Sequence, residues 1–206
     1  KEFAVNATKE EGEYYTPHDV VQLIASMIEP YEGTLYDPAC GSGGMFIQSA
    51  ELVKSRQGDI NRINIYGQEK EAATYRLAKM NLALRGLSHN LGEASDSSFT
   101  NDLHEGLYFN YIMANPPFNL KKWYDENLKN DARWSDYEIP PEGNANYAWI
   151  LHILSHLKPS DGVAGFLLAN GALNDSDTFN IRKKLIENDK VEAIVVLPRE
   201  LFITTD

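Results

Sequence analysis

The chain has 206 residues, of which 43 % are apolar, a length and composition that fit one folded domain. No apolar run reaches the ~20 residues of a membrane helix and no signal peptide opens the chain, which argues against a membrane-bound protein and favours a cytoplasmic one. The single cysteine, Cys40, excludes an internal disulfide, and the net charge of -11 argues against strong DNA binding by this segment alone, because lysines and arginines must neutralise phosphates.

Alternating helical and strand patterns predict an α/β fold with a doubly wound parallel sheet and helices on both faces. The first helix is expected over residues 17–30, with Thr16 as its N-cap and Pro17 at its first position. Further helices are expected over residues 44–56, 70–85, 145–157 and 177–188. Strands are expected over residues 35–36, 63–67, 91–94, 108–114, 163–169 and 191–197. Residues 119–144 carry no regular pattern, which indicates a functional loop or a mobile segment.

A glycine-rich segment, Asp37-Pro38-Ala39-Cys40-Gly41-Ser42-Gly43-Gly44, lies between a predicted strand and a predicted helix. Glycines at such a turn let the backbone approach a ligand, and the amides of the helix point into the same space. The spacing differs from the dinucleotide fingerprint, and no Lys-Ser or Lys-Thr pair follows as a phosphate loop requires. For this segment alone, a tight turn without a ligand is the alternative.

Two acidic residues follow the next two predicted strands. Glu69 ends the second strand, where a carboxylate can accept hydrogen bonds from two ribose hydroxyls, whereas a solvated carboxylate at a helix start is the alternative. Asp96 follows the third strand, where it could accept the amino group of an adenine or instead cap a turn among the neighbouring serines. Together with the glycine-rich turn, these positions indicate a nucleoside ligand.

The tetrapeptide Asn115-Pro116-Pro117-Phe118 follows the fourth predicted strand, at the edge where doubly wound sheets place ligands. An Asn oxygen and a Pro carbonyl can accept the two hydrogens of an exocyclic amine, which turns the nitrogen lone pair toward a methyl donor. Phe118 can stack on a base that has left the double helix, whereas a rigid turn is the alternative for the whole motif. We expect direct transfer with no metal and no enzyme nucleophile, and Cys40 as a small buried residue.

The glycine-rich segment resembles the S-adenosylmethionine motif of amino-methyltransferases, and Gly12-Glu13-Tyr14-Tyr15-Thr16-Pro17 resembles their second cofactor segment. With the Asn-Pro-Pro-Phe motif, Ile65-Tyr66-Gly67-Gln68-Glu69 and Asn81-Leu82-Ala83-Leu84-Arg85-Gly86 in this order, nearly the whole chain resembles the modification subunit of type I restriction-modification systems. The resemblance implies a Rossmann-like DNA adenine methyltransferase that assembles with a specificity subunit, which reads the DNA, and with a restriction subunit. It also implies an excised core without the amino-terminal helical region and the closing carboxyl-terminal strands.

The resemblance further implies which residues hold S-adenosylmethionine. They are Glu13, Tyr14, Tyr15, Thr16, Pro17, His18, Asp37, Gly41, Ser42, Gly43, Gly44, Glu69 and Asp96. Residues 13–17 would lie along the methionine end, residues 42–44 would meet the cofactor through backbone groups, and Glu69 would hold the ribose. His18 stands where relatives usually carry a basic residue, and the match around Asp96 is loose.

Residues 119–144 mix basic and aromatic side chains, including Trp123, Arg133 and Trp134, which suggests DNA contact by stacking and phosphate pairing. Because four basic residues there face six acidic ones, a solvated surface insertion is the alternative. Two other functions stay open at this stage. The same Asn-Pro-Pro grip could methylate a protein glutamine or an RNA base, and the chain could be a cofactor-binding assembly module without activity.

Overall fold

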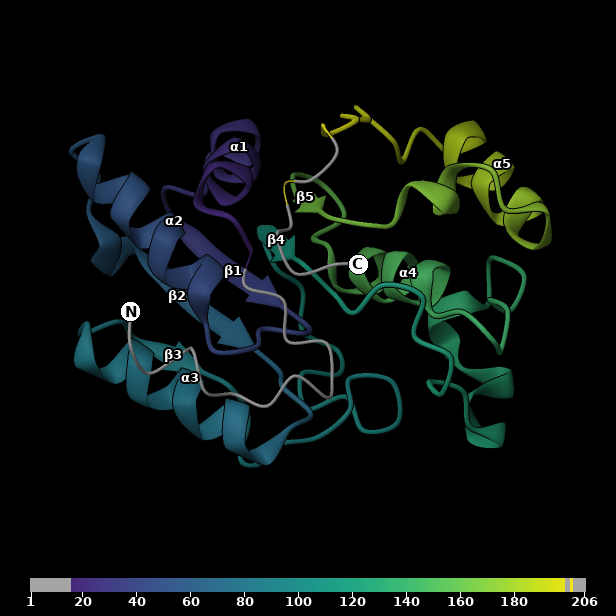
Figure 1. Ribbon diagram of the computed structural model, residues 1–206, viewed down its shortest axis with the longest axis horizontal. Coiled ribbons are helices and arrows are strands. Elements are labelled where there is room, and N and C mark those ends of the chain that lie inside the picture. The colour runs from purple at the N-terminus through teal and green to yellow at the C-terminus, as the bar shows by residue number, and fades with distance from the viewer. Residues whose placement is uncertain (1–15, 199–200, 202–206) are drawn as a thin grey trace.

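Five parallel strands form the centre of the computed structural model, which describes residues 16–198 and 201 (Figure 1). The strands are β1 (Gly33–Asp37), β2 (Ile63–Gly67), β3 (His89–Asn90), β4 (Tyr111–Ala114) and β5 (Val163–Phe166). Their order in the sheet is β3-β2-β1-β4-β5, so the winding reverses between β1 and β4. Such a switch point is where open α/β sheets bind their ligands.

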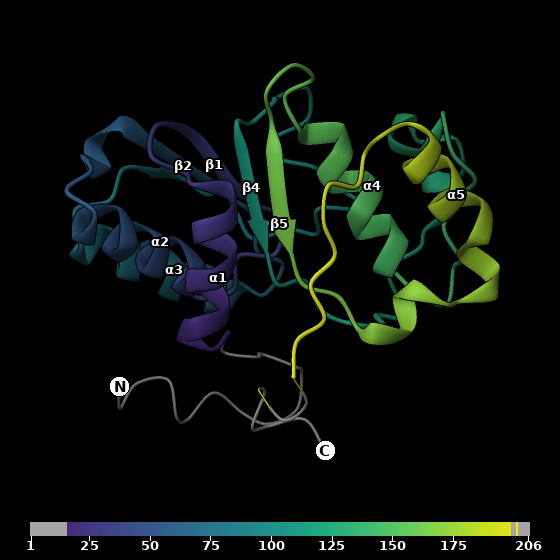
Figure 2. The same cartoon turned by 90° about the horizontal axis from the view of Figure 1, so that it is seen from above.

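Helices cover both faces of the sheet (Figure 2). They are α1 (His18–Ile28), α2 (Gly44–Ser55), α3 (Ala72–Leu84), α4 (Asn146–His156) and α5 (Phe179–Glu187). Side chains alternate along a strand, so Leu35 of β1 packs with α1, α2 and α3, whereas Tyr36 packs with Ile153 of α4 on the other face. In the described part of the chain, no helix has the length and apolar character to span a membrane.

The start of the first helix differs from the prediction. Pro17, not Thr16, is the N-cap of α1, and its carbonyl oxygen accepts the N–H of Val20. The prediction that Thr16 caps this helix is wrong because the Thr16 hydroxyl accepts a hydrogen bond from Asn115, the first residue of the Asn-Pro-Pro-Phe motif. The predicted apolar stripe is confirmed, since Val20 and Ile24 are buried against the sheet.

Two predicted strands are also wrong. β3 covers only two residues and ends before residues 91–94, because Leu91 turns into the core and Gly92 takes a left-handed φ of 79°. Residues 191–197 form no strand, and Val196 is 72 % exposed. Among the described residues β5 pairs only with β4, so no neighbouring strand supplies the hydrogen bonds that this apolar run would need.

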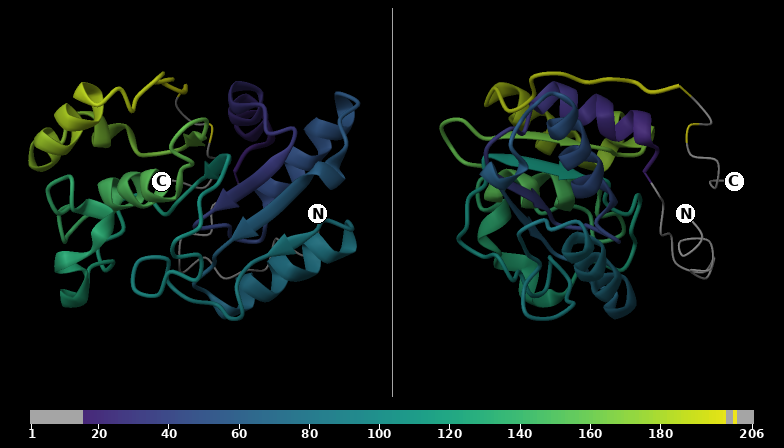
Figure 3. Two further views of the ribbon diagram at one scale, coloured as in Figure 1. Left: turned by 180° about the vertical axis from the view of Figure 1, so that it is seen from behind. Right: turned by 90° about the vertical axis from the view of Figure 1, so that its left-hand side faces the viewer.

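Residues 119–144, called the insertion below, are irregular as predicted, with the short helices η2 (Glu126–Asn130) and η3 (Ala132–Trp134). Together with α5, the insertion lies at the end of the molecule away from α2 and α3 (Figure 3). Trp123 and Trp134 are 3 % and 2 % exposed, and they pack in one cluster with Trp149 of α4. Neither indole can stack on a base, contrary to the DNA-contact hypothesis.

Candidate active site

The predicted cofactor turn and the predicted catalytic motif meet at one edge of the sheet. β1 ends at Asp37 and β4 ends at Ala114, and the two strands are parallel neighbours with Leu35 opposite Tyr111. Parallel strands present their carboxyl ends at the same edge. The glycine-rich turn and Asn115 therefore flank the switch point between β1 and β4.

The glycine-rich turn is held by α3 on one side, and its glycines leave space on the other side. Asn81 of α3 donates from Nδ2 to the Ser42 carbonyl oxygen over 3.0 Å, which holds the turn against the helix. Gly41 and Gly43 have left-handed φ values of 54° and 81°. Among the described residues other than its chain neighbours, a Cβ at Gly41 or Gly44 would meet no heavy atom within 4 Å. The backbone can therefore be approached closely by a ligand, as predicted from the glycines.

Asp37 is 2 % exposed at the end of β1. Burial raises the pKa of its carboxyl group to about 8, although the Ala39 N–H, which donates to Oδ1 over 2.9 Å, acts in the opposite direction. The nearby Glu69 carboxylate raises the pKa further. Asp37 is thus largely protonated at neutral pH, and a cationic group placed beside it would favour the ionised form.

Glu69 and Asp96 lie side by side next to the glycine-rich turn. The Glu69 carboxylate accepts the N–H of Gly41 over 2.9 Å and the N–H of Glu71 over 2.8 Å. The backbone N–H of Asp96 donates to the Glu69 carbonyl oxygen over 3.0 Å. The structure therefore brings together the three segments that were predicted to hold a nucleoside.

The Asp96 carboxylate caps its own turn in this structure. It accepts the N–H of Ser97 over 2.7 Å and the Nδ2 hydrogen of Asn101 over 2.6 Å. These bonds match the alternative interpretation of Asp96 as a turn residue. A contact between Asp96 and an adenine amino group stays a prediction.

Gln68 holds the loop that carries Asp96, a role that the sequence pattern did not predict. Its side chain is fully buried, and its Nε2 donates to the carbonyl oxygens of Asp96 and Asn101 over 3.1 and 2.7 Å. Its Oε1 accepts the N–H of Leu103 over 3.1 Å. A single carboxamide thus fixes the loop that carries Asp96. A polar residue at the end of a buried strand was the available signal, but its partners lie about 30 residues away and local spacing does not reveal them.

Asn115 follows β4 directly, and Thr16 fixes its side chain. The Asn115 Nδ2 donates to Thr16 Oγ1 over 2.9 Å, and Thr16 is 8 % exposed. Because the amide nitrogen is used in this way, Oδ1 is the group that can accept a hydrogen from an amine. Pro116 is buried, Pro117 is exposed and Phe118 is half-buried.

Three further asparagines tie the end of the Asn-Pro-Pro-Phe motif to the start of α4. Asn119, with a left-handed φ of 54°, donates its backbone N–H to Asn146 Oδ1 over 3.0 Å. In return Asn146 Nδ2 donates to Asn119 Oδ1 over 3.0 Å, and Asn144 Nδ2 donates to the same oxygen over 3.1 Å. These bonds close the base of the insertion directly after Phe118. The sequence reasoning did not identify Asn146, which is 4 % exposed.

The other predicted cofactor residues lie at the start of α1 or before it. Pro17 is half-buried, and the exposed His18 lies within 3.3 Å of Gln22 Nε2, so its contact with a cofactor carboxylate stays a prediction. The predicted residues Glu13, Tyr14 and Tyr15 lie outside the described residues.

Cys40 is 6 % exposed, which confirms the prediction of a small buried residue. Burial, together with the nearby carboxyl groups of Asp37 and Glu69, raises the pKa of its thiol well above the usual value. A thiol that stays protonated is a poor nucleophile.

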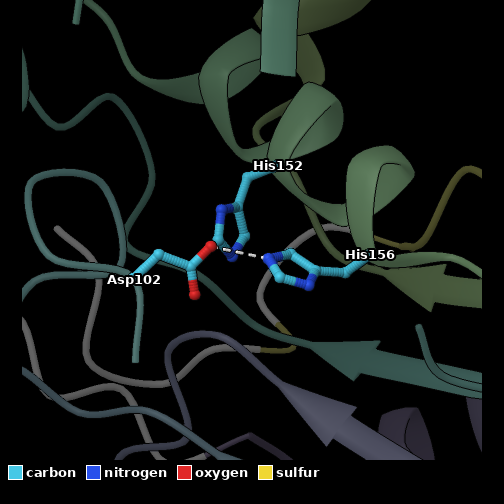
Figure 4. Close-up of side chains that lie close together, drawn as sticks. All are labelled: Asp102, His152 and His156. Carbon is cyan, nitrogen blue, oxygen red and sulfur yellow. Dashed lines mark hydrogen bonds and ion pairs between the residues drawn. The ribbon is translucent and has the colours of Figure 1, made fainter. Parts of the chain in front are cut away.

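A second group of ionisable side chains, Asp102, His152 and His156, lies between the sheet and α4. Their possible ligand atoms lie within 4.8 Å of one another (Figure 4). His156 Nδ1 bonds to the Leu107 carbonyl oxygen over 2.9 Å, and Nε2 bonds to Asp102 Oδ2 over 2.7 Å. Both ring nitrogens of His156 are thus engaged by oxygen atoms of the protein. Burial tends to raise the pKa of Asp102, but the hydrogen bond from His156, the electrostatic effect of the His152 and His156 rings and the N–H of His104 outweigh it and lower the pKa to about 2.

The tautomer of His152 shows that this group does not fit a metal ion. Arg133 Nη1 lies 3.0 Å from His152 Nδ1, and a guanidinium can only donate, so Nδ1 is the acceptor. The hydrogen of the neutral ring is then on Nε2, which faces Tyr36 Oη at 3.1 Å and cannot bind a metal. Burial lowers the pKa of His152 well below the usual value and keeps the ring neutral. The group is a buried hydrogen-bond network that joins α4 to the loop after β3.

Comparison with known proteins identifies the family. The family model described as N-6 DNA Methylase matches residues 1–206, which is the whole chain. The chain belongs to the N-6 DNA methylase family. The match confirms the predicted family. The observed parallel sheet confirms the predicted doubly wound Rossmann-like fold.

Similar members of the N-6 DNA methylase family come from bacteria and archaea. The type I restriction enzyme HindI methylase subunit of Haemophilus influenzae is 47 % identical over 206 residues, which is 98 % of this chain and 46 % of that protein. The MjaIX methylase subunit of Methanocaldococcus jannaschii is 42 % identical over 197 residues, which is 93 % of this chain and 35 % of that protein. This chain therefore spans less than half the length of these two relatives.

A solved structure of a protein with a similar description has the same fold. The type I restriction-modification system methyltransferase subunit from Streptococcus thermophilus superimposes with a TM-score of 0.74 at 30 % identity, over 88 % of this chain and 40 % of that chain. The observed fold is thus the fold of a methyltransferase subunit.

Proposed function

We propose that residues 1–206 form one catalytic domain of a DNA methyltransferase that transfers a methyl group from S-adenosylmethionine to the 6-amino group of adenine. The whole protein would be the modification subunit of a type I restriction-modification complex. One observation carries the proposal: Asn115 lies at the switch point with its amide nitrogen held by Thr16, and the open glycine-rich turn lies at the same edge. The relatives, described as type I restriction enzyme methylase subunits, support it.

The residues at this edge fit S-adenosylmethionine. The open faces of Gly41 and Gly44 admit a ligand to the backbone of residues 41–44, and Glu69 and Asp96 would hold the ribose and the adenine. Residues 13–18 would lie along the methionine end. The buried Asp37 would gain a cationic neighbour, which suits a positively charged ligand. When bound, the cofactor supplies an electrophilic methyl group on sulfur.

The catalytic motif then has to present the target amine. Asn115 Oδ1 accepts one amine hydrogen and the Pro116 carbonyl oxygen accepts the other, which draws the nitrogen lone pair out of the ring system. Neither Pro116 nor Pro117 carries an amide N–H that would compete for these acceptors. Phe118 stacks on the flipped base, since a base inside the duplex cannot reach the donor. The transfer is direct and uses no nucleophile of the enzyme.

The net charge bears on how the protein would bind DNA. With a net charge of -11, this segment cannot by itself neutralise many phosphates. DNA contacts would therefore come mainly from a specificity subunit, and a restriction subunit would complete the complex.

The test uses the full-length protein with its specificity partner, S-adenosylmethionine labelled on the methyl group, and duplex DNA that carries the partner's recognition site. Label should enter adenine, and Asn115→Ala should abolish transfer while the affinity for the cofactor is retained. Asn64→Ala, an exposed asparagine of β2, is the matched control and should transfer at the normal rate. Label in protein or RNA, or normal transfer by the Asn115 variant, would contradict the proposal.

A further inference from the structure

Arg133 of the insertion is a cation with almost no access to solvent. Its side chain is 10 % exposed, and each of its five N–H groups makes a hydrogen bond. Nε and Nη2 donate to the two carboxylate oxygens of Asp131 over 2.8 and 2.6 Å, a bidentate pair within η3 and its N-cap. Because all donors are used, Arg133 has none for a DNA phosphate, as the DNA-contact hypothesis would require.

Two of these hydrogen bonds reach the loop that carries Asp96. Nη1 donates to the Ser98 carbonyl oxygen over 2.7 Å, and Nη2 donates to the Phe99 carbonyl oxygen over 2.6 Å. Ser98 is 3 % exposed, and its hydroxyl donates to the carbonyl oxygen of Pro38 over 2.5 Å. A continuous path of hydrogen bonds therefore leads from the insertion through Ser98 to the glycine-rich turn.

The remaining bond anchors Arg133 to the sheet. Nη1 donates to His152 Nδ1 of α4, and His152 in turn contacts Tyr36 of β1. A buried charge is costly unless all of its hydrogen bonds are formed. Here the guanidinium also donates to two backbone carbonyl oxygens, which would otherwise be buried without a hydrogen-bond donor. A lysine could not replace it, because its three donors lack the planar fork that meets Asp131 and two carbonyl oxygens together.

We propose that Arg133 is a positioning residue for the cofactor: it holds residues 96–99 against Pro38 and so sets the gap in which the adenine end binds. The inference rests on the proposed function. Arg133 itself touches no cofactor atom and acts through Ser98. It also connects the two halves of the site, because the insertion starts directly after the catalytic motif.

The first experiment measures S-adenosylhomocysteine affinity of the full-length protein by calorimetry, with S-adenosylmethionine kinetics on DNA alongside. Arg133→Met should weaken binding about tenfold, which is ~1.4 kcal/mol. The KM for S-adenosylmethionine should rise in proportion while kcat changes less than about twofold, because a saturated site still presents Asn115 correctly. Arg133→Lys should recover part of the affinity, since it keeps the charge and some donors.

Arg182→Met is the matched control. Arg182 of α5 is partly buried as well, but its Nη1 donates to the Asp175 carbonyl oxygen and to Thr178 Oγ1 of its own segment over 2.6 and 2.7 Å. Its loss should leave the affinity for S-adenosylhomocysteine within about twofold of wild type. A general loosening of the fold would instead lower the affinity in both variants and would overturn the proposal.

Ser98→Ala tests the path without removing the buried charge. It deletes only the hydroxyl that bonds to Pro38, and it should weaken binding about threefold. In the double variant the two effects should combine to less than their product, because both act along one path. If Arg133→Met does not fold, the Ser98→Ala affinity decides, and a wild-type value overturns the proposal.

Two outcomes separate this inference from the proposed function. A folded Arg133→Met protein with wild-type affinity and KM, or a strictly multiplicative double variant, overturns the role of Arg133 alone. A wild-type protein with no affinity for S-adenosylhomocysteine would instead contradict the proposed function.

Discussion

The glycine-rich turn and the insertion lie beside the same edge of the sheet, but they are built in opposite ways. The turn uses its backbone: Gly41 and Gly43 take left-handed φ values, and no atom of the described residues fills the space beside the Gly41 Cα. The insertion uses its side chains: Trp123 and Trp134 fill a core, and Arg133 bonds to two other segments, the loop of residues 96–99 and α4. A backbone-built region depends on residues that are close in sequence, whereas a side-chain-built region depends on residues that are far apart.

Removal of a large side chain from the insertion should have the largest effect. Trp134→Ala would leave a cavity in the cluster formed with Trp123 and Trp149, and it should lower the free energy of unfolding by about 3–5 kcal/mol. Denaturant unfolding of the full-length protein measures this change. Lys121→Ala, an exposed position of the same insertion, should change it by less than about 0.5 kcal/mol. Equal effects would mean that the insertion is not part of the core.

A side chain added to the turn should come next. Gly41→Val would place atoms in the space beside the backbone, and it should lower the affinity for S-adenosylmethionine about 100-fold, or ~2.7 kcal/mol. Gly106→Val is the control, since Gly106 has a left-handed φ of 76° and a Cβ there would also meet no heavy atom of the described, non-neighbouring residues within 4 Å. Both variants should lose about 1–2 kcal/mol of stability from backbone strain, but only the first should lose affinity in calorimetry. Equal affinities would show that the turn does not face the cofactor.

These two predictions also show what the sequence could and could not reveal. The turn, Glu69 and Asn115 were predictable, because each lies at the end of a strand with its signal in adjacent residues. The role of Arg133 was not, because its partners Ser98 and His152 lie 35 and 19 residues away. Thr16 was predicted as a helix cap from its neighbours alone, but its hydroxyl bonds to Asn115, 99 residues further along the chain. The strand predicted over residues 191–197 failed for a similar reason, since a strand needs a partner that an apolar run does not specify.

A smaller effect is expected where the two halves of the site meet. Thr16→Val removes the acceptor of the Asn115 amide, so Oδ1 and Nδ2 can exchange places. We expect the single-turnover rate constant of methylation to fall about tenfold, with a smaller change in cofactor affinity. Thr16→Ser keeps the hydroxyl and should keep most of the rate. A Val variant as fast as the Ser variant would show that Thr16 does not orient Asn115.

The smallest effect concerns the protonation of Asp37. Its pKa of about 8 means that the carboxyl group is mostly protonated at pH 7, and a bound cation should lower that pKa. Cofactor binding at pH 7 should therefore release less than one proton, measured by calorimetry in buffers of different ionisation enthalpy. The release should shrink as the pH rises above 8 and be absent in Asp37→Asn. Unchanged release in that variant would place the proton on another group.

The bond between the Glu69 carboxylate and the Gly41 amide has a consequence for turnover. A methyltransferase must discard its spent cofactor after every reaction, and a departing ligand strips hydrogen bonds from the turn that held it. Glu69 spans from the end of β2 to that turn, so under the proposed function it would retain the Gly41 amide when the product leaves, and the turn would keep its shape for the next molecule. Exchange of cofactor would then require little rearrangement of the turn.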